Sequence, residues 1–402
     1  MGIRFDIDVN ILETVVRTLK TATSVRSSFA ILSQTCVTTD EEKQSVTFVA
    51  HIDGCKKLTP VAVTVFSPHV VVYEDGTALI DLSAKTVKFA QTEKKSNTAY
   101  VSISDNTILI KDGSYLRQIV TKKGDVSEYP SLPELSSHAK TVGYIDVGRL
   151  KLANVYSSED TTREDFVGVA VTERNGHLAL VSTDGNRLGV FTLQHYHGEP
   201  LDTEALPTGG IFFIPTAWVK TIVDSRADRI RLDEDNDEHK FRLTAQLQDG
   251  VKFDIWGRET GVQFPDFTKV VPPSTSSMTR YILEGDAKTL SDICKTELAN
   301  ISKNRTFAIR KDGSTMKQTG SPRDEYQMVE TAIRFKVEPG ADFNGQPIGI
   351  NLSFIKDTLD IIASEWKGTV EIVFYAIDGD MPITVIVNGD ESTKHIIMPM
   401  QV

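Results

Sequence analysis

A weak threefold repeat is the feature that most constrains the fold of this chain. Asp8, Asp146 and Asp286 are each followed four residues later by a Leu, and successive copies are about 140 residues apart in a chain of 402. Each Asp comes directly after a short run of β-branched and aromatic residues, so it can accept hydrogen bonds from the free N–H groups at the start of a helix. The repeat predicts three units of similar size, each with a strand that leads into a helix.

Two further landmarks recur in the same order. An Arg precedes a Phe about 20 residues after each Asp, as in Arg26 and Phe29, Arg163 and Phe166, and Arg305 and Phe307. A second amphipathic stretch follows in each third of the chain. We therefore predict two helices per unit, in the segments 9–24, 82–95, 147–157, 215–227, 287–303 and 353–367.

Alternating β-branched runs with turn signals fill the sequence between these helices. The string KDGS occurs at 111–114 and at 311–314, and it suits a hairpin turn between two strands. An aromatic-Pro pair followed by a Ser- and Pro-rich stretch marks two linkers, at Tyr129-Pro130 and at Phe264-Pro265. The sequence thus predicts an α+β fold with three tandem domains, 1–138, 139–275 and 276–402, each with two helices on antiparallel sheet.

The charge is divided unevenly along the chain. The net charge is −11, yet the six predicted helical segments carry +7 and the remainder carries −18. Two interpretations of this division stay open: either Lys and Arg simply favour helices, or the helices form a basic surface that faces phosphates without reading bases. The acidic total alone therefore does not exclude a nucleic-acid partner.

Composition and the start of the chain exclude several classes of protein. The sequence has no run of roughly 18 apolar residues and no basic-then-apolar leader, so we expect a soluble cytoplasmic protein without a membrane partner. Only three Cys occur, and they are scattered, which argues against a disulfide framework and against a thiolate metal cluster. We expect no metal and no cofactor.

Signatures of nucleotide binding and of hydrolases are missing from the sequence, since GxxxxGK[ST], GxGxxG, GxSxG and HExxH do not occur. The acidic run 233–237 resembles the start of a calcium loop, but Glu238 stands where such a loop needs Gly, so we interpret the run as a solvated acidic hairpin. His195 and His197 have no third ligand nearby and are interpreted as part of a surface loop. We predict no catalytic residues, and a scaffold or binding protein rather than an enzyme.

Three strings carry a resemblance to a known family: STDGNRLGV at 182–190, FPDFTKVVP at 264–272 and IIMPMQV at 396–402. In this order they are similar to the bacterial sliding clamp, the beta subunit of DNA polymerase III, which has a TDG-x-RL strand, an aromatic-Pro-Asp-aromatic turn and a terminal MPM-x-aliphatic tail. The resemblance extends in outline over the whole chain through the threefold repeat. The chain resembles a divergent member, because Ala30, Asn186, Lys269 and the ending Gln401-Val402 depart from the family's pattern.

The resemblance implies a homodimeric ring in which each three-domain chain is one half and double-stranded DNA passes through a helix-lined hole. Such a clamp catalyses nothing and tethers a polymerase by topology, so weak, sequence-independent contacts to DNA suffice. DNA polymerase, the clamp loader and repair proteins would insert short peptides into an apolar pocket. The pocket residues that the resemblance implies are Phe166, Thr183, Gly185, Asn186, Arg187, Leu188, Pro265, Lys269, Val270, Phe307, Asn351, Phe354, Ile396, Ile397, Met398, Pro399 and Met400.

The tail suits such a pocket because Met side chains adapt to several partners. Two interpretations stay open for Ile396 and Ile397, which either line the pocket or form the last core strand. Arg187 either binds the peptide or closes a structural salt bridge. The cations that we expect to face DNA phosphates are Arg26, Arg163, Lys20, Lys85, Lys88, Arg149, Lys151 and Lys220. For Arg26 and Arg163 a surface salt bridge is the alternative that stays open.

Two alternatives to a functional clamp remain at this point. A clamp-like decoy would bind replication proteins without loading on DNA. A multidomain hydrolase with a diffuse active site would use Asp184 and His195, and a metal-dependent activity lost on Asp184→Ala would support it.

Overall fold

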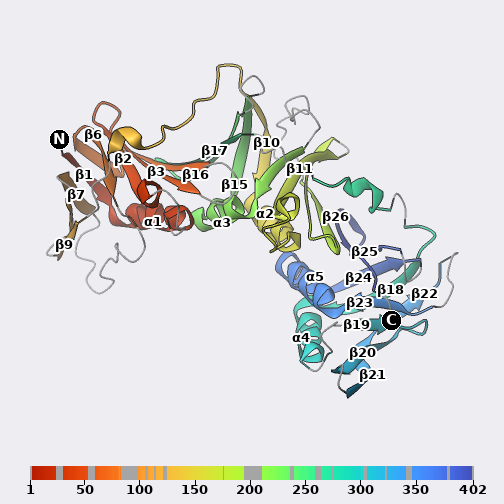
Figure 1. Cartoon of the computed structure of the whole chain (residues 1–402). Coiled ribbons are helices and arrows are strands. Elements are labelled where there is room, and N and C mark those ends of the chain that lie inside the picture. The colour runs from red at the N-terminus through yellow and green to blue at the C-terminus, as the bar shows by residue number, and fades with distance from the viewer. Residues whose placement is uncertain are drawn as a thin grey trace. The chain divides into compact units, whose positions relative to one another are not determined.

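A computed structural model describes residues 2–23, 30–52, 59–80, 82, 98–104, 107–112, 115–120, 125–174, 176–193, 211–235, 240–258, 264–272, 275–299, 301, 306–321, 324–340, 346–377 and 381–400 (Figure 1). The chain divides into two compact units. Unit 1 comprises Met1–Lys151, Asn175–Leu178 and Gln194–Val262, and unit 2 comprises Leu152–Arg174, Ala179–Leu193 and Gln263–Val402.

The α-helices of the described residues match five of the six predicted segments. They are α1 (Val9–Thr23), α2 (Val147–Ala153), α3 (Thr216–Ser225), α4 (Ala287–Leu298) and α5 (Leu352–Glu365). The third predicted segment is shorter as an α-helix than expected, because α2 passes at Asn154 into the 3-10 turn η3 (Asn154–Tyr156). The predicted helix at 82–95 lies outside the described residues, except for its first residue.

The repeated Asp residues begin helices, as the repeat predicted. The carboxylate of Asp8 accepts from the Asn10 amide at 2.8 Å, that of Asp146 from the Arg149 amide at 2.7 Å, and that of Asp286 from the Thr289 amide at 2.9 Å. Each bond satisfies an N–H group that has no partner inside the first helical turn.

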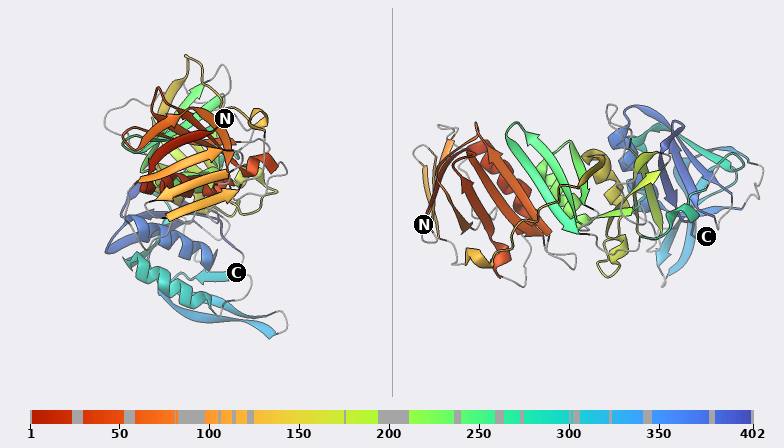
Figure 2. Two further views of the ribbon diagram at one scale, coloured as in Figure 1. Left: turned by 90° about the vertical axis from the view of Figure 1, so that its left-hand side faces the viewer. Right: turned by 90° about the horizontal axis from the view of Figure 1, so that it is seen from above.

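Among its described residues, unit 1 contains two antiparallel sheets. In the five-stranded sheet the order is β5 (Val70–Glu74), β1 (Ile3–Asp8), β7 (Thr98–Ser104), β8 (Thr107–Asp112) and β9 (Tyr115–Val120); Figure 2 shows β7 to β9 in orange beside the red β1. In the eight-stranded sheet the order is β10 (Lys140–Asp146), β15 (Arg229–Asp235), β16 (Lys240–Gln248), β17 (Val251–Arg258), β4 (Thr59–Phe66), β3 (Ser45–Ile52), β2 (Thr35–Asp40) and β6 (Gly76–Ile80). A further strand, β14 (Ile211–Pro215), leads directly into α3.

Helices α1 and α3 contact each other on one side of the strands of unit 1 (Figure 1). The Arg17 Nε group of α1 donates to the Asp224 carbonyl of α3 at 3.1 Å. The predicted apolar face of α1 is confirmed, since Val15 and Leu19 are buried. Trp218 of α3 is buried as well, so both helices turn the apolar stripe read from the sequence into the core.

Unit 2 also has antiparallel sheet. One sheet contains β11 (Gly168–Arg174), β12 (His177–Thr183), β13 (Arg187–Thr192), β26 (Asp390–Ile397), β25 (Ile383–Val387), β24 (Thr369–Ala376), β18 (Thr279–Asp286) and β22 (Lys336–Glu338) in this order. A four-stranded sheet follows the order β21 (Asp324–Arg334), β20 (Ser314–Ser321), β19 (Thr306–Ile309) and β23 (Ile348–Asn351). Helices α4 and α5 contact each other beside these strands (Figure 1).

The α+β class with antiparallel sheets is thus confirmed. The two units cut across the predicted domains, because strand pairing continues past both linkers: Phe253 of β17 pairs with Val63 of β4, and Leu188 of β13 pairs with Ile396 of β26. The division into three domains stays a prediction. The turn at 311–314 is present, with Gly313 at φ +78°, whereas part of the one at 111–114 lies outside the described residues.

The interpretation of residues 233–237 as a solvated hairpin was wrong in one respect. Strands β15 and β16 do form a hairpin, but Asp233, Glu234 and Asp235 are 4%, 4% and 1% exposed. Asp233 is covered by Thr141 and Arg242 of the neighbouring strands, and Asp235 accepts from the amide of Ser136 in the linker. In the part of the chain that the structure describes, no helix is both long and apolar enough to cross a bilayer.

Candidate functional site

The turn between β12 and β13 is held in one shape by its own side chains. The Asp184 Oδ1 atom accepts from the amides of Asn186 and Arg187 at 2.9 and 3.0 Å. The Thr183 hydroxyl donates to the Arg187 carbonyl at 2.7 Å and accepts from the Gly185 amide at 3.0 Å. Gly185 has φ +92°, a left-handed conformation that favours glycine. The TDG string is therefore a rigid turn that ends at Arg187.

Arg187 lies in a network that uses both ends of its guanidinium group. Its Nε donates to Asp184 Oδ2 at 3.0 Å and its Nη1 to Asp357 Oδ2 at 2.7 Å, while its Nη2 donates to the Val155 carbonyl at 3.2 Å. Burial disfavours the charge, but Asp357 and Asp184 outweigh it and raise the pKa of Arg187. Only 11% of the side chain is exposed. The geometry favours the structural salt bridge among the two interpretations of Arg187.

A buried aromatic pair lies behind Arg187. The Tyr156 hydroxyl and His395 Nδ1 are 2.6 Å apart, and the Thr358 hydroxyl lies 3.3 Å from the same Tyr156 oxygen. Burial raises the pKa of Tyr156. The Arg187 guanidinium carbon lies 5.5 Å from the centroid of the Tyr156 ring. These contacts connect η3, α5 and β26 beneath the turn, and sequence reasoning missed Tyr156 and His395 because they are 239 positions apart.

The C-terminal tail is fastened to this turn. Ile396 and Ile397 of β26 are 1% and 0% exposed, which makes them the last core strand, one of the two interpretations of this pair. Beyond them the Met398 amide donates to the Asn186 carbonyl at 2.8 Å, and the Met400 amide donates to the Gly349 carbonyl of β23 at 2.8 Å. Met398, Pro399 and Met400 remain half-buried at this point.

The start of α5 contributes a third side. Asn351 caps the helix, because its Oδ1 atom accepts from the amide and the hydroxyl of Ser353 at 3.0 and 2.6 Å. Phe354 follows on the first turn, half-buried, with its ring centroid 4.9 Å from the guanidinium carbon of Arg187. Asn351 therefore positions Phe354 by capping the helix.

Phe166 and Arg163 form a stacked pair at the 3-10 turn η4 (Glu164–Phe166). The Arg163 guanidinium lies 4.0 Å from the Phe166 ring centroid, and its Nη1 donates to the Asp184 carbonyl at 3.0 Å. A Cβ atom on Gly185 would lie 2.9 Å from Arg163 Nη2. This pair thus contacts the Asp184–Gly185 turn. The contact of Arg163 with DNA stays a prediction.

These contacts link a set of exposed and half-buried residues that we name the Arg187 surface: Phe166, Asn186, Arg187, Phe354, Met398, Pro399 and Met400. Other residues from the predicted pocket lie elsewhere in unit 2. Leu188 and Phe307 are 4% and 0% exposed, because Leu188 faces inward from β13 and Phe307 fills the core around β19. Lys269 is 79% exposed and pairs at 3.3 Å with Asp266, which caps the turn η6 (Phe267–Lys269) next to Pro265 and Val270.

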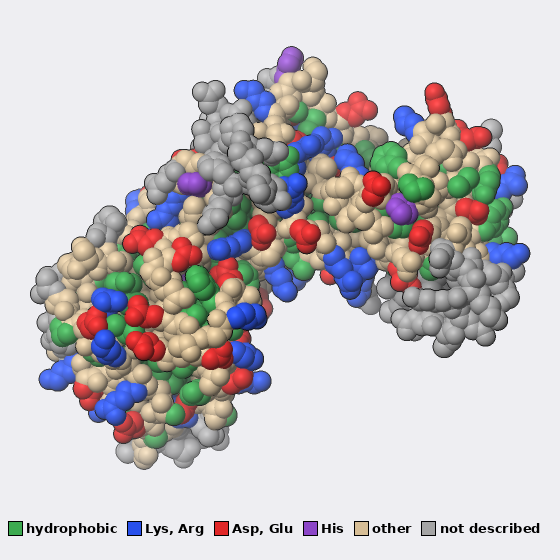
Figure 3. Space-filling model, turned by 180° about the vertical axis from the view of Figure 1, so that it is seen from behind, with side chains coloured by type: hydrophobic (Ala, Val, Ile, Leu, Met, Phe, Trp, Pro, Cys, Tyr) green, Lys and Arg blue, Asp and Glu red, His purple; other side chains and the backbone are tan. Residues whose placement is uncertain are grey.

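Some of the cations that were predicted to face DNA belong to the described residues and others do not. Lys20, Lys151 and Lys220 are exposed on α1, α2 and α3, and Arg149 is half-buried on α2. Arg26, Lys85 and Lys88 lie outside the described residues. With the bounds found here, α1 and α2 have net charges of +1 and +2, but α5 has −2. The expected basic character is thus limited to part of the helices, and on the face shown in Figure 3 Lys and Arg lie among Asp and Glu.

Among the described residues, no group of three His, Cys, Asp or Glu side chains lies close enough together to hold a metal ion. Of the two residues of the hydrolase alternative, Asp184 is engaged with its turn and Arg187, and His195 lies outside the described residues. The residues around Arg187 instead form a half-buried apolar surface. Arg187 is held beside it by its ion pairs, and the tail is held by backbone hydrogen bonds. Such a surface is suited to bind a short peptide.

Solved structures of bacterial clamps resemble this chain over its full length. The DNA polymerase III beta subunit of Thermotoga maritima matches with a TM-score of 0.76 and 17% identity, covering 100% of both chains. The sliding clamp of Pseudomonas aeruginosa bound to griselimycin matches with 0.74 and 17%, and that of Bacillus subtilis with 0.74 and 18%, again over 100% of both chains. No family model and no curated protein matches the sequence. The chain therefore has the sliding-clamp fold, as the three strings indicated.

Proposed function

We propose that this chain is a DNA sliding clamp, a non-catalytic processivity factor that encircles duplex DNA as a cytoplasmic homodimeric ring. The observation that carries the proposal is the match in fold to bacterial clamps over the complete length of both chains. In this proposal each chain supplies three clamp domains and half of the ring. Polymerase, clamp loader and repair proteins bind through short peptides at the Arg187 surface.

The arrangement of the Arg187 surface supports peptide binding. Phe354 and the two tail Met residues offer apolar area, and unbranched Met side chains repack around different partners. Arg187 forms ion pairs with Asp184 and Asp357, so its role is to order the surface and not to bind the peptide directly. Because the surface is ordered before binding, a short peptide loses less free energy to reorganisation on docking.

The exposed Lys residues on α1, α2 and α3 support a weak contact with phosphates. A ring that holds DNA by topology needs little affinity, and strong positive charge would slow its movement. The modest charge of the described helices is compatible with this requirement. Lys20, Lys151 and Lys220 are therefore the cations that we assign to the DNA-facing side.

Retention on DNA tests the ring. Clamp loaded by its cognate loader on a nicked plasmid circle is separated from free protein by gel filtration, before and after the plasmid is linearised. We expect the clamp to stay on the circle and to leave the linear form. Equal loss from both forms would refute encirclement. The variant with Lys20, Lys151 and Lys220 all changed to Gln should load less but still depend on circularity.

A clamp-like decoy is the second candidate, and the low charge of α4 and α5 is the observation in its favour. A decoy would bind polymerase-derived peptides at the Arg187 surface with normal affinity. It would not be retained on circular DNA under any loading condition. The plasmid assay together with a peptide titration therefore separates the two candidates.

A further inference from the structure

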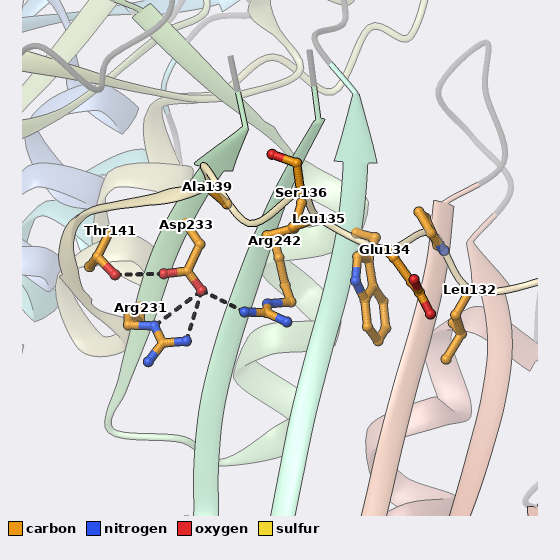
Figure 4. A pocket seen from close by; sticks show the side chains of 11 residues that line it. Leu132, Glu134, Leu135, Ser136, Ala139, Thr141, Arg231, Asp233 and Arg242 are labelled. Carbon is orange, nitrogen blue, oxygen red and sulfur yellow. Dashed lines mark hydrogen bonds and ion pairs between the residues drawn. The ribbon is translucent and has the colours of Figure 1, made fainter. Parts of the chain in front are cut away.

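A polar pocket of about 630 Å³ lies within unit 1 (Figure 4). One wall is the first linker, which contributes Leu132, Pro133, Glu134, Leu135, Ser136 and Ala139. The other wall is one face of the eight-stranded sheet, which contributes Thr141, Arg231, Asp233, Arg242 and Trp256. Pockets of this size accommodate small ligands or a few peptide residues.

The sheet wall is a continuous row across four neighbouring strands. Thr141 of β10 pairs with Asp233 of β15, Asp233 pairs with Arg242 of β16, and Arg242 pairs with Trp256 of β17. Directly paired residues project from the same side of a sheet. The row therefore presents a hydroxyl, a carboxylate, a guanidinium and an indole ring, side by side, to the linker.

One buried carboxylate holds two guanidinium groups at the floor of the pocket. Asp233 Oδ2 accepts from Arg231 Nη2 at 2.8 Å and from Arg242 Nη2 at 3.1 Å, and Asp233 Oδ1 accepts from the Thr141 hydroxyl at 2.8 Å. Burial disfavours the charged form, but the bonds from Arg231, Thr141 and Arg242 outweigh it and lower the pKa of Asp233. Arg242 Nε also lies 3.9 Å from Asp254, which pairs with Lys252 at 2.9 Å, so three cations against two carboxylates leave this floor with one positive charge.

The two arginines keep capacity for a ligand. Their side chains are 37% and 26% exposed, against 6% for Asp233. A guanidinium group has five N–H donors in a planar fork that matches a carboxylate. Arg231 uses its Nε and one Nη2 hydrogen on Asp233, which leaves three of its five donors for other partners.

Apolar side chains lie next to this cationic floor. Trp256 is 7% exposed and belongs to a core cluster with Tyr129, against which Leu132 of the linker packs. Leu135 and Pro133 extend the apolar lining along the linker. Glu134 is the one acidic side chain of the linker wall, and it is exposed to solvent. The pocket thus combines a positively charged floor with an apolar side.

We propose that this pocket is a second peptide-binding site, which takes an acidic residue on Arg231 and Arg242 and a neighbouring apolar residue on Trp256 and Leu132. The choice of a peptide rests on the proposed function, since the Tyr129-Pro130 linker repeats the Phe264-Pro265 linker of unit 2, the unit that also carries the Arg187 surface. The cationic floor and its apolar side do not depend on that function.

Fluorine NMR of the full-length protein with 5-fluorotryptophan tests the proposal. The chain has three Trp, and the Trp256→Phe variant assigns the resonance of Trp256. The probes are the capped tripeptides acetyl-Leu-Glu-Leu-amide and acetyl-Leu-Gln-Leu-amide, and sodium phosphate. We expect a saturable shift of the Trp256 resonance, with the Glu peptide bound about tenfold or more tightly than the Gln peptide, because a charge-assisted hydrogen bond distinguishes them.

Matched variants locate the effect. Arg231→Gln should remove the preference for Glu over Gln, whereas Arg229→Gln should keep it, because Arg229 lies on the same strand but contacts Tyr144 and does not line the pocket. Equal affinity for both peptides, or an equal loss in the Arg229 variant, would overturn the proposal. A phosphate response as strong as that of the Glu peptide would make this an anion site only.

Deletion of residues 398–402 separates this proposal from the previous one. The deletion removes the tail from the Arg187 surface and should leave the Trp256 response unchanged. Loss of the Trp256 response would mean that the tripeptide acts through the Arg187 surface, and the second site would then be refuted. A preserved Trp256 response together with normal binding of polymerase-derived peptides would refute the Arg187 assignment instead.

Discussion

Replacing Arg187 by Lys should loosen the tail while the chain stays folded. A Lys ammonium group is a single point charge, so it cannot contact Asp184, Asp357 and the Val155 carbonyl together as the planar guanidinium group does. The variant then loses about one charge-assisted bond and one neutral bond. Such bonds contribute about 1.5–3 and 0.5–1.5 kcal/mol, so the local cost is about 2–4.5 kcal/mol.

Hydrogen exchange measured by mass spectrometry detects this cost at the tail. The Met398 amide is bonded to the carbonyl of Asn186, the residue before Arg187. A local loss of about 2 kcal/mol raises the opening equilibrium by about 30-fold, so peptides that cover the tail should exchange faster by on the order of that factor. Affinity for a polymerase-derived peptide should fall with it.

The matched control is Arg280→Lys, the same substitution in the same unit. Arg280 pairs with Glu338 on the surface, with both side chains more than a third exposed, and exposed pairs contribute little. Exchange at the tail should be unchanged in this control. Unchanged tail exchange in the Arg187 variant as well would show that the network does not order the surface, and the reasoning would be refuted.

Three further predictions concern stability. Gly185→Ala should lower the melting temperature, since φ +92° is strained for Ala by about 1–2 kcal/mol and the new Cβ displaces Arg163; an unchanged melting temperature would contradict the strain. Burial lowers the pKa of His51 in the folded protein to about 4. As the pH falls, His51 is therefore protonated in the unfolded chain before it is protonated in the folded one, and the free energy of unfolding should drop between pH 6.5 and 4. Denaturation across this range should show less pH dependence in His51→Gln. Asp286→Ala removes the cap of α4 and should speed amide exchange at Thr289, with exchange in α5 as the internal control.

Much of the local structure was predictable because it depends on near neighbours in the sequence. The Asp caps reach amides two or three residues ahead, and the apolar stripes of α1 and α3 follow the helical period. The rigid turn at Gly185 is visible as the TDG string for the same reason. Part of the Arg187 surface was predictable only through its resemblance to a family.

The sites themselves depend on residues that are far apart in the sequence. Arg187 and Asp357 are 170 positions apart and Tyr156 and His395 are 239 apart, so no local pattern relates them. The order of strands brings them together, as the pairing of β13 with β26 does for the turn and the tail.

The acidic run at 233–237 shows most clearly what the sequence determined and what the tertiary structure decided. By itself the sequence determined a hairpin with charged side chains, because alternation and turn chemistry are local. Only the sheet decided that Asp233 is buried, since the strands on either side supply Thr141 and Arg242 as partners for its charge. A buried carboxylate persists only where such partners exist, and pairing between strands, not composition, places them.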